Sequence, residues 1–507
     1  MLPSKAFRCW CSLVFLPSER HLTICLLFGA TVLATMMFQP PAASPGSRAQ
    51  TLDGLVFTKN EWTERAVQAH LDQAQYQGRV SEARFDRLVA HGEQLFRARF
   101  TIHDGVGRPN ATQAIIPTKR RRPAAFTFQR LAGLDAGSCA TCHRDPIVGG
   151  SGDFALNAFV SEGFVTPDFD TIDPQFSNER NTNHLFGAGL IELLAREMTS
   201  DLHTLRRQAL RAARLSGRKI SRRMVTKGVD FGTIVAQPNG LVDLDQVKGV
   251  DFDLVVRPFG QKGVIGSLRQ FTINALNHHH GMQATERFGP RWTGENDFDG
   301  DGKLTELSPG DVSALVAWQA TLGPPVQQRP SAPDRSAAVK RGSLQFDELG
   351  CENCHRRFLP LQSTIFVDPG PYETAGTLRQ GDIVLPTSYD LADLDGFQNL
   401  ERDGRNRLLV PLFGDLKRHR MTDRQVSSLG NELLSQRFVD RTEFQTTELW
   451  GIGSTAPYGH RGDFTTLDGV IRAHGGDART SRDRYLGLTS TDRRNIILFL
   501  KTLVIEQ

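Results

Sequence analysis

Two short motifs of cysteine and histidine carry the clearest chemistry in the sequence. Both have the pattern Cys-x-x-Cys-His, at residues 139–143 and 351–355. Two thiols three positions apart can each form a thioether with a haem vinyl group, and the adjacent histidine can then ligate the iron. One copy could equally be a redox or zinc-binding pair. Because the pattern occurs twice, we predict two covalent c-type haems, held by Cys139, Cys142, His143, Cys351, Cys354 and His355.

The elements that must position these motifs show the same twofold pattern. His-Gly-Glu-Gln-Leu-Phe at residues 91–96 precedes the first motif, and Arg-Gly-Ser-Leu-Gln-Phe at residues 341–346 precedes the second. A glycine on a helix lets another helix approach closely, and the following aromatic ring can pack beside a haem. We therefore expect two copies of one unit, the first with a long insertion before its cysteines. Residues 51 to about 90 are predicted to be an amphipathic helix.

Each copy is predicted to close with a helix. Ser308 and Asp311 form a capping-box pattern around Pro309 at the first helical position, and Thr489 and Asp492 stand in the same relation near the C-terminus.

The Pro-rich, polar segment 324–337 lies between these units and is the best domain boundary in the chain. We accordingly predict a mainly α fold of two cytochrome c-like haem domains with long loop insertions. The N-terminal haem domain would span residues 51–330 and the C-terminal one residues 331–507.

The composition of the chain limits the cellular compartment and the kinds of partner that the protein can have. The net charge of +4 is too small to indicate nucleic acid as a partner, and the cysteines outside the two motifs all lie within the first 25 residues. Residues 22–38 are apolar, follow Arg20 and His21, and precede a stretch of prolines and alanines. We therefore predict that residues 1–50 are a signal peptide, with an uncleaved inner-membrane anchor as the alternative. Haem is attached covalently outside the bacterial cytoplasm, so we expect a periplasmic protein.

The order of further motifs resembles a known family. The first haem motif is followed by Arg-Asn-x-x-x-Leu-Phe-Gly-x-Gly-Leu-Ile-Glu at residues 180–192 and by Phe-Asp-Gly-Asp-Gly-x-x-x-Glu-Leu at residues 298–307. The second is followed by a long block at residues 449–476 that contains Thr-Ala-Pro-Tyr-Gly-His. Over roughly residues 90 to 505 this order resembles dihaem oxidoreductases of the bacterial cytochrome c peroxidase superfamily, which also includes a methylamine dehydrogenase maturation enzyme and a rubber oxygenase.

The resemblance implies a division of labour between the haems. The N-terminal haem would meet the oxidant, and the C-terminal haem would store or relay electrons from a small donor protein, a cytochrome c or a cupredoxin. It also implies a sixth ligand for the C-terminal haem, fourteen residues after His460, which is His474. Thr465 and Asp468 are predicted to cap a short helix that ends beside His474. The alternative is that His474 only caps that helix.

The pocket of the N-terminal haem is less determined by the sequence. No histidine follows His143 at the spacing of a distal ligand, since the next one is His184. His278–Met282, His-His-His-Gly-Met, could place one histidine near this haem, could contribute to a zinc or copper site, or could lie at the surface.

Two residues are candidates for catalysis. Glu192 lies in an apolar helical stretch, where burial would raise its pKa and suit it to acid–base work on peroxide, and its alternative is a salt bridge with Arg196. His460, with Tyr458, could line the space between the haems or be a packed pair. Arg461 stands where family members often have an acidic residue, which leaves any inherited role of His460 open.

Calcium has two candidate sites. The resemblance implies an ion between the haems, bound by Asn181 and the backbone carbonyls of Thr455 and Pro457. Separately, Asp297, Asp299, Asp301 and Gly302 reproduce the first half of an EF-hand loop. The twelfth position is Ser308 instead of glutamate, so Glu306 would have to substitute, and a plain Asp-Gly turn is the alternative.

The leading functional hypothesis is therefore a periplasmic, peroxidase-like dihaem enzyme that reduces hydrogen peroxide or another small oxidant. An oxygenase or oxidase of an organic substrate could use the same haem pair. A non-enzymatic electron carrier, with both haems six-coordinate, is the third hypothesis.

Overall fold

The computed structural model describes residues 64–506 except 112–115, 120–136 and 160–176. The predicted leader lies outside these residues. None of the described helices combines the length and the apolar character needed to cross a bilayer.

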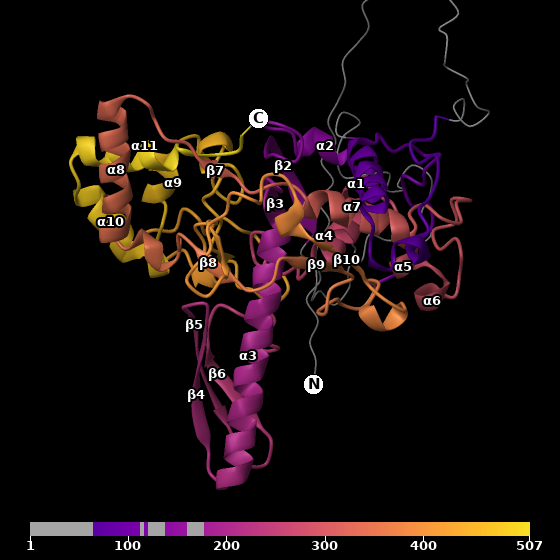
Figure 1. Ribbon diagram of the computed structural model, residues 1–507, viewed down its shortest axis with the longest axis horizontal. Helices are drawn as coiled ribbons and strands as arrows, with labels where there is room; N and C mark the ends of the chain where they lie inside the picture. The colour runs from indigo at the N-terminus through magenta and orange to yellow at the C-terminus, as the bar shows by residue number, and fades with distance from the viewer. Residues whose placement is uncertain (1–63, 112–115, 120–136, 160–176, 507) are drawn as a thin grey trace, which may run out of the picture. The chain divides into compact units, whose positions relative to one another are not determined.

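Two pairs of packed helices form the frame that carries the cysteine motifs (Figure 1). In the first pair, α1 (Glu82–Arg97) packs on α7 (Pro309–Ala320), and in the second, α8 (Pro333–Glu348) packs on α11 (Ser490–Leu500). A Cβ atom added to Gly92 of α1 would lie 2.0 Å from the carbonyl oxygen of Ala314. A Cβ atom added to Gly342 of α8 would lie 2.0 Å from the carbonyl oxygen of Asn495. The predicted repeat, in which a glycine permits close helix packing, is thus confirmed.

The closing helices begin where their caps predict. Ser308 and Asp311 form the capping box of α7 with Pro309 at its start, and Thr489 accepts a hydrogen bond from the backbone of Asp492 at the start of α11. Asp311 also accepts hydrogen bonds from the rings of two histidines, one of which, His91, lies on α1. The cap of α7 therefore also ties α7 to α1.

The predicted helix over residues 51 to about 90 is wrong for residues 64–81 and confirmed from residue 82 onward. A 3-10 turn (Gln73–Tyr76) and the strand β1 (Gly78–Arg79) precede Ser81, which is the N-cap of α1. Gly78 has a φ of +78°, a backbone conformation that a helix cannot continue through. The helix therefore begins at Glu82 and contains the His-Gly-Glu-Gln-Leu-Phe motif.

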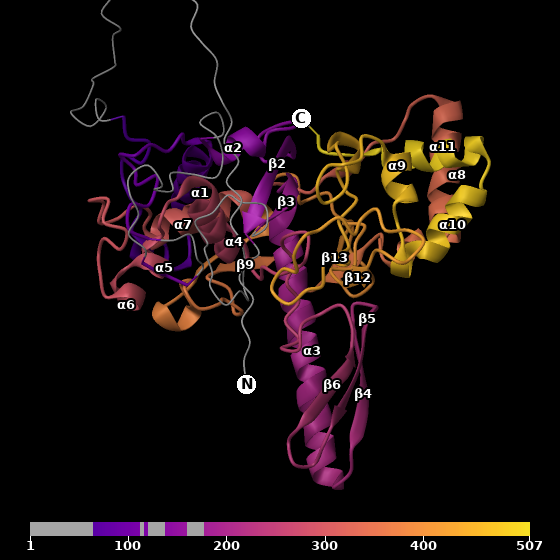
Figure 2. The ribbon, with the colours of Figure 1, turned by 180° about the vertical axis from the view of Figure 1, so that it is seen from behind.

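The longest helix, α3 (Ala188–Ser216), carries a three-stranded antiparallel sheet on its C-terminal part, which Figure 2 shows from behind. This sheet consists of β4 (Ile220–Thr226), β5 (Val229–Ala236) and β6 (Val242–Val247). Phe231 and Ile234 of the sheet are fully buried in one core cluster with Ala209 and Ala213 of the helix. The remaining helices are α2 (Cys139–Cys142), α4 (Leu268–Ala275), α5 (Thr285–Phe288), α6 (Pro290–Thr293), α9 (Leu467–Arg472) and α10 (Arg479–Gly487).

The other strands pair in small sheets that join distant parts of the sequence. The strand β1 lies parallel to β10 (Thr387–Asp390), which pairs with β9 (Ile365–Asp368), and β7 (Val326–Gln327) pairs with β14 (Leu503–Val504). Two-stranded sheets are formed by β2 (Gly152–Phe159) with β3 (Ser177–Thr182), β8 (Leu359–Leu361) with β11 (Leu408–Val410), and β12 (Arg418–Arg420) with β13 (Glu443–Gln445).

The prediction of a mainly α fold is therefore wrong. Helices account for 36% of the structure and strands for 17%. The strands lie in the long connections that were expected to be loops, and most are too short to show a period of two in the sequence.

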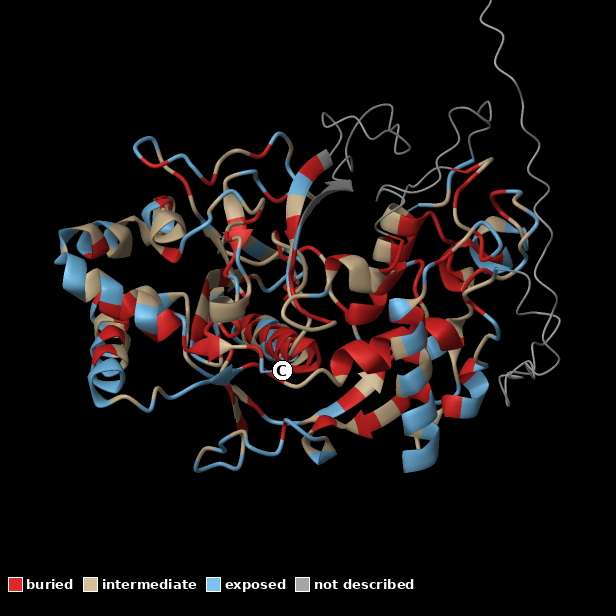
Figure 3. Ribbon diagram, turned by 90° about the horizontal axis from the view of Figure 1, so that it is seen from above, coloured by how far each residue is buried: buried red, intermediate tan, exposed pale blue. Residues whose placement is uncertain are grey.

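The predicted domain boundary falls between α7 and α8. One core cluster nevertheless includes residues from both sides of it, among them Leu194 of α3 and Leu359 of β8. Figure 3 colours the buried residues red, in this core and elsewhere in the described structure. The partition into haem domains at residues 51–330 and 331–507 stays a prediction.

The contact at Gly342 leads to a stability test. In Gly342→Ala the new methyl group would overlap a backbone carbonyl of α11, so we expect the free energy of unfolding to fall by about 1–3 kcal/mol. Gly487→Ala in α10 is the matched control, because a Cβ there meets nothing within 4 Å. Urea unfolding of both variants measures the difference, and equal midpoints would show that α8 and α11 do not depend on this contact.

Candidate functional site

Both cysteine motifs face one cavity. It has a volume of about 570 Å³ and is lined by Cys139, Cys142, His143, Cys351, Cys354 and His355. None of these four cysteines forms a disulfide in the described structure. The second motif begins at Cys351, 208 positions after the first motif ends at His143, so only the folding of the chain brings the two motifs to a common space. Thiols and histidines at the wall of so large a cavity fit the attachment of haem.

The N-terminal motif is held by a short helix and an aromatic ring. The backbone N–H of His143 donates to the carbonyl of Cys139 at 3.0 Å, which closes α2. The ring of Phe96, four residues after Gly92 on α1, lies 6.0 Å from the ring of His143. Burial lowers the pKa of His143 to about 4. The imidazole is therefore neutral near pH 7, as an iron ligand must be.

The C-terminal motif repeats this arrangement. His355 donates its backbone N–H to Cys351 at 3.0 Å, and the ring of Phe346 lies 6.4 Å from the ring of His355. Burial, and after it the nearby His474, lowers the pKa of His355 to about 4. Its Nδ1–H donates to the carbonyl of Phe413 at 3.2 Å, so Nε2 is the nitrogen left for a metal.

His474 lies at the end of α9 and lines the same cavity. Thr466, one residue after the predicted cap, accepts the capping hydrogen bond from the backbone of Gly469. The Nδ1–H of His474 donates to the carbonyl of Val470 at 2.7 Å, and burial lowers the pKa of the ring. Nδ1 is engaged, so Nε2 is the nitrogen left for a metal, and His474 lies near enough to His355 to lower its pKa. Both observations support His474 as the sixth ligand of the C-terminal haem, which stays a prediction.

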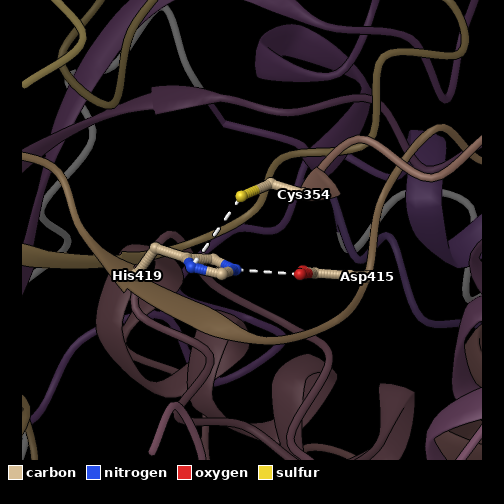
Figure 4. A group of neighbouring side chains, drawn as sticks. All are labelled: Cys354, Asp415 and His419. Carbon is tan, nitrogen blue, oxygen red and sulfur yellow. Dashed lines mark hydrogen bonds and ion pairs between the residues drawn. The ribbon is translucent and has the colours of Figure 1, made fainter. Parts of the chain in front are cut away.

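A group of three side chains beside the second motif, of which only Asp415 is fully buried, was not predicted. His419 lies between Cys354 and Asp415, with Nδ1 3.8 Å from the sulfur and Nε2 2.8 Å from a carboxylate oxygen (Figure 4). Burial alone would lower the pKa of His419, but Asp415 and then Cys354 outweigh it and raise the pKa to about 10. A histidine protonated at pH 7 has no lone pair for iron, which makes His419 a weaker ligand candidate than His474. The Asp-x-x-x-His spacing was the only sequence signal.

The three consecutive histidines belong to a π-helix, Leu276–His280, and all of them line the cavity. The side chain of His280 places Nε2 3.9 Å from the sulfur of Cys139. Burial, and after it His143, lowers the pKa of His279 to about 4, and its Nδ1 has no hydrogen-bond partner in the described part of the chain. The hypothesis that this segment lies near the N-terminal haem is thus supported by geometry.

His184 also reaches this end of the cavity, although its spacing predicted no role. Its Nε2 lies 3.0 Å from the carbonyl oxygen of Trp450 and donates to it. Burial lowers the pKa of His184 to about 4, and His143 contributes to the shift.

His460 and Tyr458 line the cavity as well. The His460 ring lies 4.3 Å from the ring of Phe444, and its Nε2 is 3.5 Å from a carboxylate oxygen of the fully buried Glu432. Burial, followed by Arg180 and other cations, lowers the pKa of His460 to about 3. The imidazole is neutral at every physiological pH, so a role in catalysis would be as a neutral donor or acceptor.

Glu192 does not line the cavity. One of its carboxylate oxygens accepts from the Arg196 guanidinium, and the other accepts from the backbone N–H of Leu268 at 2.8 Å. Burial raises the pKa of Glu192, and Arg196 opposes the rise. These contacts favour the salt-bridge alternative over acid–base work on a substrate.

The residues of the first calcium candidate lie together at the cavity. Asn181 donates its side-chain N–H to the carbonyl of Pro457 at 3.0 Å, and its side-chain oxygen has no hydrogen-bond partner in the described structure. Thr455 lines the same cavity. The second candidate is also assembled, since carboxylate oxygens of Asp297, Asp299 and Asp301 lie within 4.8 Å of one another.

Two Cys-x-x-Cys-His motifs that face one cavity, each with a neutral histidine, define a dihaem redox protein. Residues 405–503 match the family model "Di-haem oxidoreductase, putative peroxidase", and the resemblance drawn from the motifs is confirmed. The chain is a haem-dependent oxidoreductase. The matched segment includes His460 and His474 and begins after both haem motifs.

Solved structures offer distant likenesses. One is hydrazine synthase of Kuenenia stuttgartiensis pressurised with xenon, at 14% identity and a TM-score of 0.32, covering 86% of this chain and 96% of that chain. Another is a MauG-like protein associated with microbial copper homeostasis, at 14% identity and a TM-score of 0.26, covering 52% of this chain and 77% of that chain. No curated protein matches the sequence.

The position of His474 predicts a spectroscopic change. We expect His474→Ala to convert the C-terminal haem from low-spin to high-spin, because His355 would remain as its single protein ligand, and to leave the N-terminal haem unchanged. Optical and EPR spectra of the ferric protein measure this, with the exposed His103→Ala as the control. A spectrum identical to wild type would place the sixth ligand elsewhere, with Met421 next to test because it also lines the cavity.

Proposed function

We propose that this protein is a periplasmic dihaem c-type peroxidase that reduces hydrogen peroxide at the N-terminal haem site with electrons relayed through the C-terminal one. The observation that carries the proposal is the shared cavity, because it gives both haem motifs one connected space. The family match supports the reaction class. The apolar leader and the two attachment motifs support the compartment.

The residues of each motif would hold one haem. Cys139 and Cys142 would form the thioethers of the N-terminal haem and His143 would ligate its iron, and Cys351, Cys354 and His355 would do the same for the C-terminal haem. When bound, each haem supplies one-electron redox chemistry at its iron. Peroxide reduction consumes two electrons and two protons and yields two water molecules, so two haems match the electron count.

The chain's own contribution at the N-terminal site is to handle protons. His279 is neutral, faces the cavity and keeps Nδ1 free of any described hydrogen bond, so Nδ1 can accept a proton from bound peroxide and return it to the leaving oxygen. Trp450 and Phe96 line the same cavity and limit the access of water.

The C-terminal site would be closed to substrates. His355 and His474 would both hold this haem through its iron, which suits a haem that only receives and passes on electrons. We infer that the donor is a small redox protein, a cytochrome c or a cupredoxin.

Calcium belongs to the same proposal. Asn181 and the carbonyls of Thr455 and Pro457 would hold an ion between the haems, with the side-chain amide of Asn181 turned so that its oxygen faces the ion.

Haem content tests the attachment. We expect two haems per chain that resist acidified-solvent extraction in a pyridine haemochrome assay. The double variant Cys351→Ala/Cys354→Ala should retain one, because only the first motif keeps its thiols. One haem in the wild type, or release of haem into the solvent, would contradict covalent attachment at both motifs.

Turnover tests the function. We expect peroxide-dependent oxidation of reduced cytochrome c, abolished in His143→Ala and retained in the control His103→Ala. His279→Gln should lower kcat by about 10²–10⁴-fold, the usual contribution of a proton-transfer group. Since His279 and His460 have pKa values lowered to about 4 and about 3, neither should add a titration between pH 6 and 8 to the rate profile of the wild type.

The alternatives have distinct outcomes in the same assays. If the N-terminal haem is six-coordinate in every redox state and turnover is absent, the protein is an electron carrier. If peroxide is ignored and dioxygen is consumed with an organic substrate, it is an oxygenase.

A further inference from the structure

The loop between α6 and α7 gathers acidic side chains away from the haem cavity. Asp297, Asp299 and Asp301 bring carboxylate oxygens within 4.8 Å of one another. Asp297 is held in place by the backbone, because its two oxygens accept from the N–H groups of Gly300 at 2.8 Å and Gly302 at 2.9 Å. None of the three carboxylates forms a described salt bridge with a lysine or arginine.

Asp299 is the decisive residue of this cluster. Its relative exposure is 1%, and neither of its carboxylate oxygens has a hydrogen-bond partner in the described structure. An unpaired, buried carboxylate is costly, and buried charges in proteins are normally paired or bound to a metal. Asp299 turns its oxygens toward the oxygens of two further aspartates, which can only accept. A cation is the missing partner.

Glu306 is a fourth acidic side chain near these aspartates. It is buried, burial and next the charge of Asp299 raise its pKa well above the usual range, and one oxygen, Oε2, accepts from the backbone N–H of Gln283 at 2.6 Å. Ser308, at the twelfth position of the EF-hand pattern, is engaged elsewhere. Its hydroxyl caps α7 through Asp311 and donates to the carbonyl of Leu71 at 2.8 Å. Glu306 is therefore the acidic side chain that can take the place of the usual glutamate.

We propose that Asp297, Asp299, Asp301 and Glu306 bind one Ca²⁺ ion, and that this ion fixes the π-helix that carries His278–His280. Four carboxylates and no nitrogen or sulfur donor select a hard cation, and the flexible coordination of calcium tolerates an incomplete EF-hand pattern. The site is separate from the haem cavity, which none of the four residues lines.

The link to the π-helix runs through two contacts. Glu306 binds the backbone of Gln283, three residues after the π-helix ends. The buried Arg108, whose charge acts on Asp299 and Glu306, donates to the carbonyl of Asn277 at 2.7 Å and to that of Gly281 at 3.3 Å. An ion that neutralises the carboxylates would change the balance of charge around this arginine and so the position of the histidines.

Calcium binding to the full, haem-loaded protein tests the site. Asn181→Ala serves as the background, because it removes the proposed ion between the haems. We expect this protein, stripped with chelator and titrated calorimetrically, to bind one Ca²⁺. Adding Asp299→Asn should weaken that binding at least about tenfold, because a charged ligand becomes neutral at almost the same volume. Asp86→Asn, an exposed aspartate of α1, is the control and should bind as the background does.

The haem spectrum tests the coupling. Removal of calcium from the Asn181→Ala background should change the absorption and EPR signals of the N-terminal haem and leave those of the C-terminal haem unchanged. Glu306→Gln provides a second variant if Asp299→Asn does not fold. No binding to the background protein at about 1 mM Ca²⁺ would overturn the site, and binding without any change at the N-terminal haem would overturn the link to the π-helix.

Discussion

The close packing of a glycine-bearing helix against a closing helix is the constraint on which the rest of the structure depends. At Gly92 and Gly342 the backbones approach so closely that a single methyl group would overlap a carbonyl oxygen of the partner helix. Four residues later, about one turn along the same face, Phe96 and Phe346 meet the histidines of the two motifs. The glycine thus fixes where the two helices cross, and the phenylalanine four residues later packs beside the motif histidine that is predicted to ligate the haem.

Burial of histidine is the second common feature of the site. Desolvation lowers the pKa values of four histidines that line the cavity: His143, His279, His355 and His474. Their rings are therefore neutral near pH 7, and no neighbouring cation is needed to keep them unprotonated. His419 is the exception, because Asp415 keeps it charged. A protonated ring beside Cys354 would offer a hydrogen-bond donor and a positive charge to whatever lies against the second motif.

The two ends of the cavity differ in how their histidines are held. At the C-terminal end, His474 follows a capped helix, and the carbonyl of Val470 sets the orientation of its ring. At the N-terminal end, the histidines lie on a π-helix, a rare form of helix that is frequent at functional sites, and Nδ1 of His279 has no hydrogen-bond partner in the described structure. This difference favours a fixed ligand at one haem and an adaptable pocket at the other.

The sequence by itself determined the local features: the two Cys-x-x-Cys-His motifs, the Gly-x-x-x-Phe repeat, the caps at Ser308 and Thr489, and the acidic pattern at Asp297–Asp301. Each depends on residues within about one turn or loop of one another, so spacing alone is informative. Only the tertiary structure decided which distant groups meet. It placed Glu192 with Arg196 and Leu268 instead of in the cavity, brought His184 and His279 to the neighbourhood of His143, and left Asp299 without a partner. It also turned the expected loops into small sheets, such as β1 with β10, because strands of two to eight residues are stabilised by partners that lie far away in the chain.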